Sequence, residues 1–262
     1  MQITEQPSLY DHLEKKSVRE ILEDINREDQ KVASAVQKAI PQIEHLVNLI
    51  VPRMRQGGRI FYMGAGTSGR LGVLDASEVP PTFGMSPNWI IGLIAGGDTA
   101  LRNPVEGAED DTNRGWEELT EHHINNKDTV IGIAASGTTP YVIGALHEAR
   151  KQGILTGCIT SNPDSPMAAE ADVAIEMIVG PEYVTGSSRV EIGTRAKNDS
   201  KHDQHFCDDP TRTGERKQNG EHAIEQSKVS GKRNTDDYGG IRIRPRSCPK
   251  VIIASWFGKE SN

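Results

Sequence analysis

The stretch RIFYMGAGTSGRLGVLDASEVPP, Arg59–Pro81, decides the fold. An apolar run at Ile60–Met63 leads into a turn with three glycines, Gly64, Gly66 and Gly69, and a helical pattern follows. A strand that ends in a glycine-rich turn and a helix is typical of α/β proteins, in which the free N–H groups at the start of the helix favour an anion. The stretch therefore predicts a parallel sheet with an anion-binding turn after its first strand.

Four more apolar runs of strand length follow that turn, with helix-length segments between them. Short, continuously apolar strands that alternate with helices are typical of a parallel sheet covered on both faces. We therefore expect an α/β fold with a doubly wound, five-stranded parallel sheet, whose strands should be Ile60–Met63, Trp89–Ile94, Thr129–Ala134, Ile154–Ile159 and Val173–Ile178. Ligands of such folds bind outside the carboxyl ends of the strands, so the loops after these runs form the candidate site.

Helices are predicted before the sheet. A capping box at Ser17–Glu20 opens an amphipathic pattern that ends near Asn26. A second helical stretch extends over 29–55, with an interruption or kink at Pro41. The predicted organisation is an N-terminal helical segment over 1–56, a sheet domain over 57–195 and a disordered tail over 196–262.

The composition excludes several classes of protein. The net charge of the 262 residues is −7, so the chain has no general attraction for nucleic acid or for an anionic membrane. No apolar run approaches the roughly 18 residues of a membrane span, and the N-terminus lacks the basic start and apolar core of a secretory signal. The three cysteines show neither metal-ligand spacing nor an even disulfide framework. We expect a cytoplasmic protein with reduced thiols and no bound metal.

The first turn, Gly64–Gly69, matches the G-x-G-x-x-G pattern of dinucleotide sites, but the rest of that pattern is missing. A dinucleotide site needs an acidic residue about 20 residues beyond the turn, at the end of the second strand. Here the second predicted strand is followed by Asp98, which lies well past that distance. Thr67 and Ser68 instead add hydroxyl groups that can donate to a phosphate monoester. We therefore favour a sugar phosphate over a dinucleotide, with a purely structural glycine turn as the other alternative.

A second hydroxyl-rich turn, Ser136-Gly137-Thr138-Thr139, follows the third predicted strand. Two such turns at neighbouring strand ends suit one phosphate and the hydroxyl groups of a sugar better than a pyrophosphate. The alternative is ordinary helix N-capping, which is the better explanation for Ser136 taken alone. A third cluster follows the fifth strand, where Ser187 and Ser188 are candidate ligands and Arg189 could pair with an anion.

Three glutamates are candidates for acid–base chemistry. Glu78 lies in the short predicted helix Leu71–Val79 after the first turn, and Glu106 and Glu109 follow the second strand, so all three can reach one edge of the sheet. Two carboxyl groups in different environments allow one to be protonated and the other ionised near neutral pH. A single glutamate is more often part of a solvated helix face, and the residues alone leave this choice open.

Five motifs in order resemble the N-acetylmuramic acid 6-phosphate etherase family, from about Ser17 to Arg189. The motifs are GAGTSGRLGVLDASEVPPTFG, GLIAGG, VEGAEDD, IGIAASGTTPYVIGAL and GPEYVTGSSR. The resemblance implies the sugar-isomerase (SIS) fold, which the glucokinase regulatory protein shares. It also implies cleavage of the lactyl ether of N-acetylmuramic acid 6-phosphate to N-acetylglucosamine 6-phosphate and D-lactate, by a homodimer that serves cell-wall recycling without a metal or redox cofactor.

The resemblance assigns roles to the residues of the motifs. Glu78 matches the family's proton donor, and Glu109 matches its second acid–base residue. The substrate-binding positions implied are Gly66, Thr67, Ser68, Glu106, Ser136, Gly137, Thr138, Thr139, Ser187 and Ser188. In the implied reaction a carboxylate removes the C2 proton, which the aldehyde of the open-chain sugar acidifies, and an acid protonates the ether oxygen as it leaves C3. Water then adds at C3.

The resemblance stops after Arg189, where members of the family continue with further helices. Here Val190–Lys197 is followed by a charged tail without leucine, which is typical of disorder. When permitted codons for Asn198–Arg216 and for the residues that follow are read one base later, the continuation from Arg216 gives a peptide similar to the family's own sequence. We hypothesise that a frameshift near Val190 replaced the C-terminal helices, and this predicts weak dimerisation, poor solubility and little activity for this chain.

Other functions are compatible with the same turns. A non-catalytic sugar-phosphate-binding regulatory protein would carry them without turnover, and D-lactate release separates it from the enzyme. An aldose–ketose isomerase of the same fold is disfavoured by the context of Glu109. A transcription regulator would need a basic helix-turn-helix at its N-terminus, which the acidic helices there do not offer.

Overall fold

The computed structural model describes residues 2–185 of the chain. The candidate ligands Ser187 and Ser188, Arg189, the expected frameshift near Val190 and the predicted tail 196–262 lie outside the described residues. The division of the chain after residues 56 and 195 stays a prediction.

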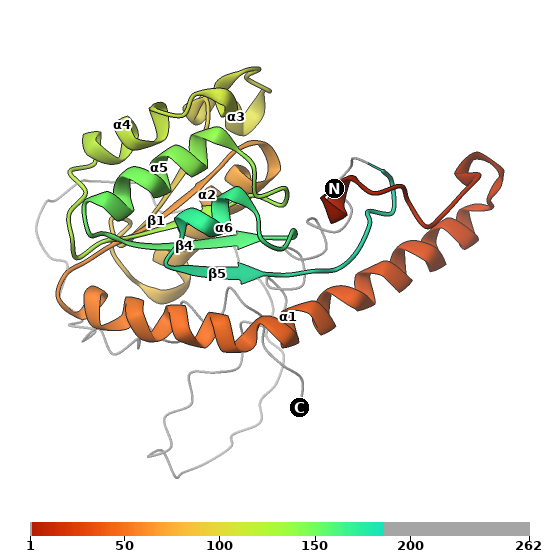
Figure 1. Ribbon diagram of the computed structural model, residues 1–262, viewed down its shortest axis with the longest axis horizontal. Helices are drawn as coiled ribbons and strands as arrows, with labels where there is room; N and C mark the ends of the chain where they lie inside the picture. The colour runs from red at the N-terminus through yellow and green to blue at the C-terminus, as the bar shows by residue number, and fades with distance from the viewer. Residues whose placement is uncertain (1, 186–262) are drawn as a thin grey trace, which may run out of the picture.

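The described residues form a sheet of five parallel strands (Figure 1). The strands are β1 (Ile60–Gly64), β2 (Ile90–Ile94), β3 (Thr129–Ile133), β4 (Leu155–Thr160) and β5 (Val173–Glu176). Their order in space is β2-β1-β3-β4-β5, and all neighbours are parallel. The predicted five-stranded parallel sheet is confirmed. The chain passes from β1 to β2 on one side and returns to β3 on the other, so the switch point of the topology lies between β1 and β3.

Helices cover both faces of the sheet (Figure 1). One face packs against α1 (Val18–Arg55) and α2 (Gly66–Phe83), and the other against α4 (Arg114–Glu121), α5 (Pro140–Lys151) and α6 (Pro166–Glu170). Strand β1 shows how the sequence makes two cores, because successive side chains of a strand point to opposite faces. Ile60 and Tyr62 belong to the core under α1 and α2, and Phe61 and Met63 belong to the core under α5.

Helix α1 is one continuous helix of 38 residues. The prediction of two helical stretches separated near residues 27–28 is therefore wrong, while the capping box is present, with the Ser17 hydroxyl oxygen accepting from the N–H of Glu20. Pro41 lies inside the helix, where it removes one backbone hydrogen bond, and Figure 1 shows a change of direction near the middle of α1. Packing explains why the helix continues, since Leu46 and Ile50 beyond the proline are fully buried in the core.

The first residues of the chain lie beyond the ends of β4 and β5, and the chain then runs away from the sheet to the start of α1 (Figure 1). Residues 2–10, here called the N-terminal strap, contain the short 3-10 helix Ile3–Glu5, and a second one follows at Leu13–Lys15. The strap lies beside the loops that follow β4 and β5. Within residues 2–185, no helix is both long enough and apolar enough to cross a membrane.

Candidate functional site

The first turn lies where β1 passes into α2. Gly66 has a φ of +52°, and Thr67 and Ser68 are half-buried in the first turn of the helix. The N-cap residue Ala65 supplies no side-chain hydrogen bond to the free N–H groups of α2. An uncapped helix N-terminus with two hydroxyl groups in its first turn suits an anion that can accept hydrogen bonds.

The other two glycines of this turn serve packing. A Cβ atom on Gly69 would lie 2.6 Å from the Ile94 side chain and 2.7 Å from the Gly64 carbonyl oxygen, and one on Gly64 would lie 2.7 Å from the Gly69 nitrogen. Helix α2 can therefore approach β1 and β2 only if both residues are glycine. The G-x-G-x-x-G spacing follows from this close approach and does not select a dinucleotide.

The second turn connects β3 to α5 and lies next to the first. β1 pairs with β3, and their last residues Gly64 and Ile133 are partners in the register, so both turns start at the switch point. In this turn the Ser136 hydroxyl oxygen accepts from the N–H of Thr138, at 3.2 Å, and from its hydroxyl group, at 3.1 Å. Thr139 is the N-cap residue of α5, yet its side chain makes no capping hydrogen bond.

Side-chain N-capping, which was the alternative reading of these hydroxyl groups, is therefore absent from both turns. Gly137 has a φ of +69°, and a Cβ atom there would lie 2.4 Å from Ser165. This close contact seats the second turn against the loop that follows β4. The two turns present two helix N-termini, Thr67, Ser68 and Thr138 at one edge of the sheet.

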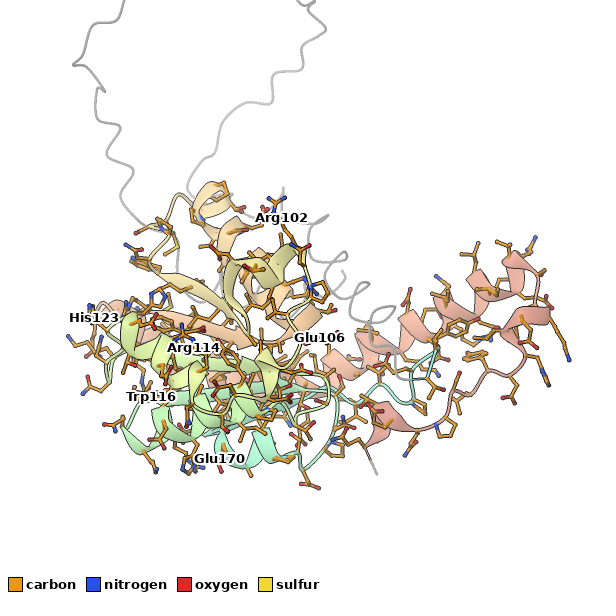
Figure 2. The ribbon with its side chains drawn as sticks, turned by 90° about the horizontal axis from the view of Figure 1, so that it is seen from above. Arg102, Glu106, Arg114, Trp116, His123 and Glu170 are labelled. Atoms are coloured by element: carbon orange, nitrogen blue, oxygen red, sulfur yellow. The ribbon has the colours of Figure 1, made fainter. Side chains whose placement is uncertain are left out.

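Glu106 and Glu109 lie on the same edge, in the exposed segment after α3 (Gly97–Arg102) that can be followed in Figure 2. Val105 packs against Gly96, just beyond the end of β2, where a Cβ atom would lie 2.9 Å from it. The carbonyl oxygen of Thr112 occupies the space beside Gly144 in α5. These two contacts hold the segment between the end of β2 and the first half of α5, which starts at the second turn.

Glu78 lies elsewhere. Helix α2 is longer than the predicted Leu71–Val79, because it begins at Gly66 and continues through Pro80 and Pro81 to Phe83. At a rise of 1.5 Å per residue, Glu78 is about 16 Å further along the helix axis than Thr67. Its side chain is exposed. Within one chain Glu106 and Glu109 lie on the edge of the sheet that carries the two turns, whereas Glu78 lies further along α2.

The orientation of α2 explains why Glu78 points outward. Asp75, one turn earlier, faces the sheet, where burial raises the pKa of Tyr62 well above its usual value and the nearby charge and hydrogen bond of Asp75 raise it further. The side of the helix opposite the buried Ala76 carries Glu78 and, four residues earlier, Leu74, whose exposed fraction is 52%. Both side chains therefore face away from the sheet.

Two residues that support the site were missed from the sequence. Arg70 in α2 donates from Nε to the Leu101 carbonyl oxygen, at 3.1 Å, and from Nη2 to that of Ala100, at 2.8 Å, so it ties the first turn to the end of α3. Asn162, in the loop after β4, is 2% exposed and bonds to the second turn. Its place just after the fourth predicted strand was the available signal.

No group of three or more potential ligand side chains in the described part of the chain is arranged to hold a metal ion. This edge carries two hydroxyl-rich turns at helix N-termini, with carboxylates nearby.

Comparison with known proteins gives the site a context. Residues 42–150 match the glucokinase regulatory protein N-terminal SIS domain, and residues 117–191 match the SIS domain. An N-acetylmuramic acid 6-phosphate etherase from Bacteroides fragilis is 84% identical over 197 residues, which are 75% of this chain and 70% of that protein. The etherase from Porphyromonas gingivalis strain W83 is 77% identical, over 74% of this chain and 71% of that protein. More distant is the etherase from Christiangramia forsetii, at 61% identity over 74% of this chain and 71% of that protein.

A match of 197 residues must reach position 197 at least, so the likeness extends beyond Arg189, where the sequence motifs placed its end. Among solved structures, a phosphoheptose isomerase from Neisseria gonorrhoeae superposes with a TM-score of 0.53 at 17% identity. The superposition covers 68% of this chain and 92% of the isomerase chain, and it confirms the predicted SIS fold.

Proposed function

Because this chain belongs to the N-acetylmuramic acid 6-phosphate etherase family, we propose that it is an etherase that acts on the sugar phosphate for which the family is named. It would cleave the D-lactyl ether of N-acetylmuramic acid 6-phosphate and release N-acetylglucosamine 6-phosphate and D-lactate. The observation that carries this proposal is the pair of uncapped, hydroxyl-rich turns at the switch point, with Glu106 and Glu109 on the same edge.

The phosphate of the substrate would bind at the two turns. The first turn of α2 offers N–H groups without side-chain caps. Helix α5 begins with Pro140, which has no N–H, so it contributes chiefly the positive end of its helix dipole. The proposed binding residues among those described are Gly66, Thr67, Ser68, Glu106, Ser136, Gly137, Thr138 and Thr139. Ser187 and Ser188 complete the set as sequence predictions.

The reaction needs a base at C2 and an acid at the ether oxygen on C3. The base takes the C2 proton, the C2 electron pair forms a double bond to C3, and the C3–O bond breaks as the acid protonates the departing lactate oxygen. Water then adds to C3 and returns a proton to C2. Glu109 and Glu78 are the proposed pair, in an order that the residues leave open, and the turns hold C2 and C3 at a fixed distance from them.

Glu78 can take part only if a second copy of the chain supplies it. It lies about 16 Å along α2 from the first turn, which is too far for a sugar phosphate anchored there in the same chain. Leu74 beside it is 52% exposed, so an interface on this face of α2 would bury an apolar side chain next to Glu78. We propose a homodimer in which each site combines Glu109 of one copy with Glu78 of the other.

The alternative is a sugar-phosphate-binding protein without turnover. It is favoured by the match of residues 42–150 to the glucokinase regulatory protein SIS domain. Both readings predict binding of N-acetylglucosamine 6-phosphate, and only the etherase releases D-lactate.

The decisive experiment is a D-lactate release assay on purified protein with N-acetylmuramic acid 6-phosphate. Glu109→Gln and Glu78→Gln should each lower kcat by about 10²–10⁴-fold, which is the usual worth of a residue that transfers a proton. Glu44→Gln is the matched control, because Glu44 is an exposed glutamate on α1 with no role at this edge. Binding of the product without any D-lactate release would favour the regulatory protein.

The frameshift hypothesis predicts that this chain has low activity and dimerises weakly. Its direct test is the coding DNA beyond residue 190, which should give a family-like sequence when read one base later. Early stop codons in that frame would contradict it. A cytoplasmic location also stays a prediction.

A further inference from the structure

Asn162 is the most heavily bonded side chain at this edge of the sheet. It follows β4 and is 2% exposed. Its Nδ2 donates to the carbonyl oxygens of Ala135, at 3.1 Å, and Ser136, at 3.2 Å, and also to the Thr4 hydroxyl group, at 2.9 Å. Its Oδ1 accepts from the N–H groups of Ile3, at 2.6 Å, and Thr4, at 3.2 Å.

These five bonds join two segments that are far apart in the sequence. On one side is the second turn, where the Ala135 carbonyl oxygen also accepts from the N–H of Ser161, at 3.0 Å, and from the Thr160 hydroxyl group, at 3.3 Å. On the other side is the N-terminal strap, whose Ile3 and Thr4 lie about 160 residues away along the chain. A buried amide that uses its donors and its acceptor is costly to disturb, because the loss of any partner leaves a buried polar group without a hydrogen bond.

The strap is also fixed at its other end. The Ser8 hydroxyl group donates to the Tyr183 carbonyl oxygen, at 2.8 Å, and the Ser8 N–H donates to the Thr185 hydroxyl oxygen, at 2.9 Å. The ring of Tyr10 lies against that of Tyr183, with ring centres 4.9 Å apart. The strap therefore spans from the loop after β5 to the loop after β4, along the edge that carries the second turn.

Between the strap and the second turn lies a small pocket of about 190 Å³. Gln2 and Ile3 form its wall on the strap side, Ser136 lies on the side of the turn, and the segment Asn162–Pro166 completes the lining. The strap is thus next to a proposed ligand of the sugar phosphate.

We propose that Asn162 is a positioning residue of the sugar-phosphate site and that the N-terminal strap is a structural part of that site. Asn162 holds the carbonyl groups of Ala135 and Ser136, which fixes the direction of the following N–H groups and of the Ser136 hydroxyl group. The strap, bonded to the other end of the same amide, keeps that amide oriented. This inference rests on the proposed function for the identity of the ligand, and on the hydrogen bonds alone for the coupling of strap and turn.

The first test compares Asn162→Asp with Asp128→Asn. The aspartate has the same shape but cannot donate to the two carbonyl oxygens, so the second turn should loosen. Asp128 is also fully buried and heavily bonded, yet it lies before β3 at the opposite edge of the sheet, so its variant controls for general destabilisation.

Three readouts are measured on the full chain. Hydrogen–deuterium exchange of the peptide that contains residues 135–139 should become about 5- to 30-fold faster in Asn162→Asp, because one or two hydrogen bonds worth about 1 kcal/mol each are lost. The Kd for N-acetylglucosamine 6-phosphate, measured by calorimetry, should rise by about tenfold or more. In turnover assays KM should rise by a similar factor while kcat changes less, since phosphate anchoring is the same in substrate and transition state. Asp128→Asn should leave exchange at 135–139 and Kd unchanged.

The second test addresses the strap. Ile3→Pro removes the N–H that bonds to Asn162, and proline suits this position because Ile3 is the first residue of a 3-10 helix. Ile3→Ala keeps that N–H and removes only the side chain. The proline variant should reproduce the faster exchange at 135–139 and the weaker product binding, and the alanine variant should do so to a smaller extent.

Unchanged exchange at 135–139 in both Asn162→Asp and Ile3→Pro would overturn the coupling. Faster exchange with an unchanged Kd would overturn the role of Asn162 in the site. If the unsubstituted chain binds no N-acetylglucosamine 6-phosphate, the proposed function fails, and the exchange data still decide whether strap and turn are coupled.

Discussion

At the scale of single residues, the glycines of the first turn separate packing from binding. Gly64 and Gly69 are required because backbone and side-chain atoms lie within 3 Å of where a Cβ atom would be. Ser68, between them in the same turn, has no such constraint and offers its hydroxyl group to the proposed phosphate. A substitution of Gly69 should therefore lower the stability of the fold, whereas a substitution of Ser68 should weaken ligand binding.

Gly69→Ala should lower the free energy of unfolding by about 1–3 kcal/mol, because the added methyl group forces α2 away from β1 and β2. Ser68→Ala should leave the free energy of unfolding within about 0.5 kcal/mol and weaken binding of N-acetylglucosamine 6-phosphate. Urea unfolding and calorimetric titration measure the two quantities. A stable Gly69→Ala protein would show that helix and strand can separate without cost.

The thiol of Cys158 should be unreactive in the folded protein. It is fully buried in β4, and burial raises its pKa to about 12, so at pH 8 it stays protonated. Because the folded pKa is above that of the unfolded thiol, this residue favours the folded state below the unfolded pKa of about 8.5, and that contribution is lost as the pH rises toward 12. Iodoacetamide at pH 8 should modify Cys158 only after urea is added, as peptide mass analysis would show. Modification of the native protein would contradict the burial.

At the scale of elements, the pattern of the sequence predicted the sheet better than it predicted the helices. The three central strands β1, β3 and β4 are short, mostly apolar runs with both faces buried, so their pattern needs no knowledge of their neighbours. Helix α1 continues through residues 27–28 and past Pro41 because its later turns pack on the sheet, and α2 continues through two prolines for the same reason. The site shows the same limit. The two turns could be predicted from the local sequence. The distance from Glu78 to the first turn depends on the length of α2, and the role of Asn162 depends on its hydrogen bonds to the N-terminal strap.

The edge of the sheet opposite the site depends on one buried ion pair. Arg59, just before β1, pairs with Asp128, just before β3, with Nη2 and Oδ2 2.8 Å apart, and it also donates to the carbonyl oxygens of His122 and His123 at the end of α4. Asp128 is fully buried. Asp128→Ala leaves the guanidinium group without its partner and should lower the free energy of unfolding by about 3–5 kcal/mol. Thermal unfolding measures this loss, and replacement of the exposed Asp110 by Ala is the comparison that should change little.

At the scale of the whole molecule, the separation of Glu78 from the two turns makes a prediction about assembly. In a homodimer that shares its sites, a mixed dimer of Glu78→Gln and Glu109→Gln chains has one site with both glutamates intact and one site with neither. A dimer whose sites lie within single chains has no intact site in any combination. The D-lactate release of a mixture of the two variants therefore distinguishes the two arrangements.

Equal amounts of the two inactive variants, unfolded together and refolded, should regain about a quarter of the D-lactate release of the unsubstituted chain, because half of the dimers are mixed and each has one intact site of two. Refolding each variant alone is the control and should give no recovery. Leu74→Glu in both chains should abolish the recovery, since it places a charge in the face of α2 that the interface would bury. If the mixture recovers nothing although it forms dimers, Glu78 does not act across an interface, and the acid–base partner of Glu109 must be sought among the groups at the two turns.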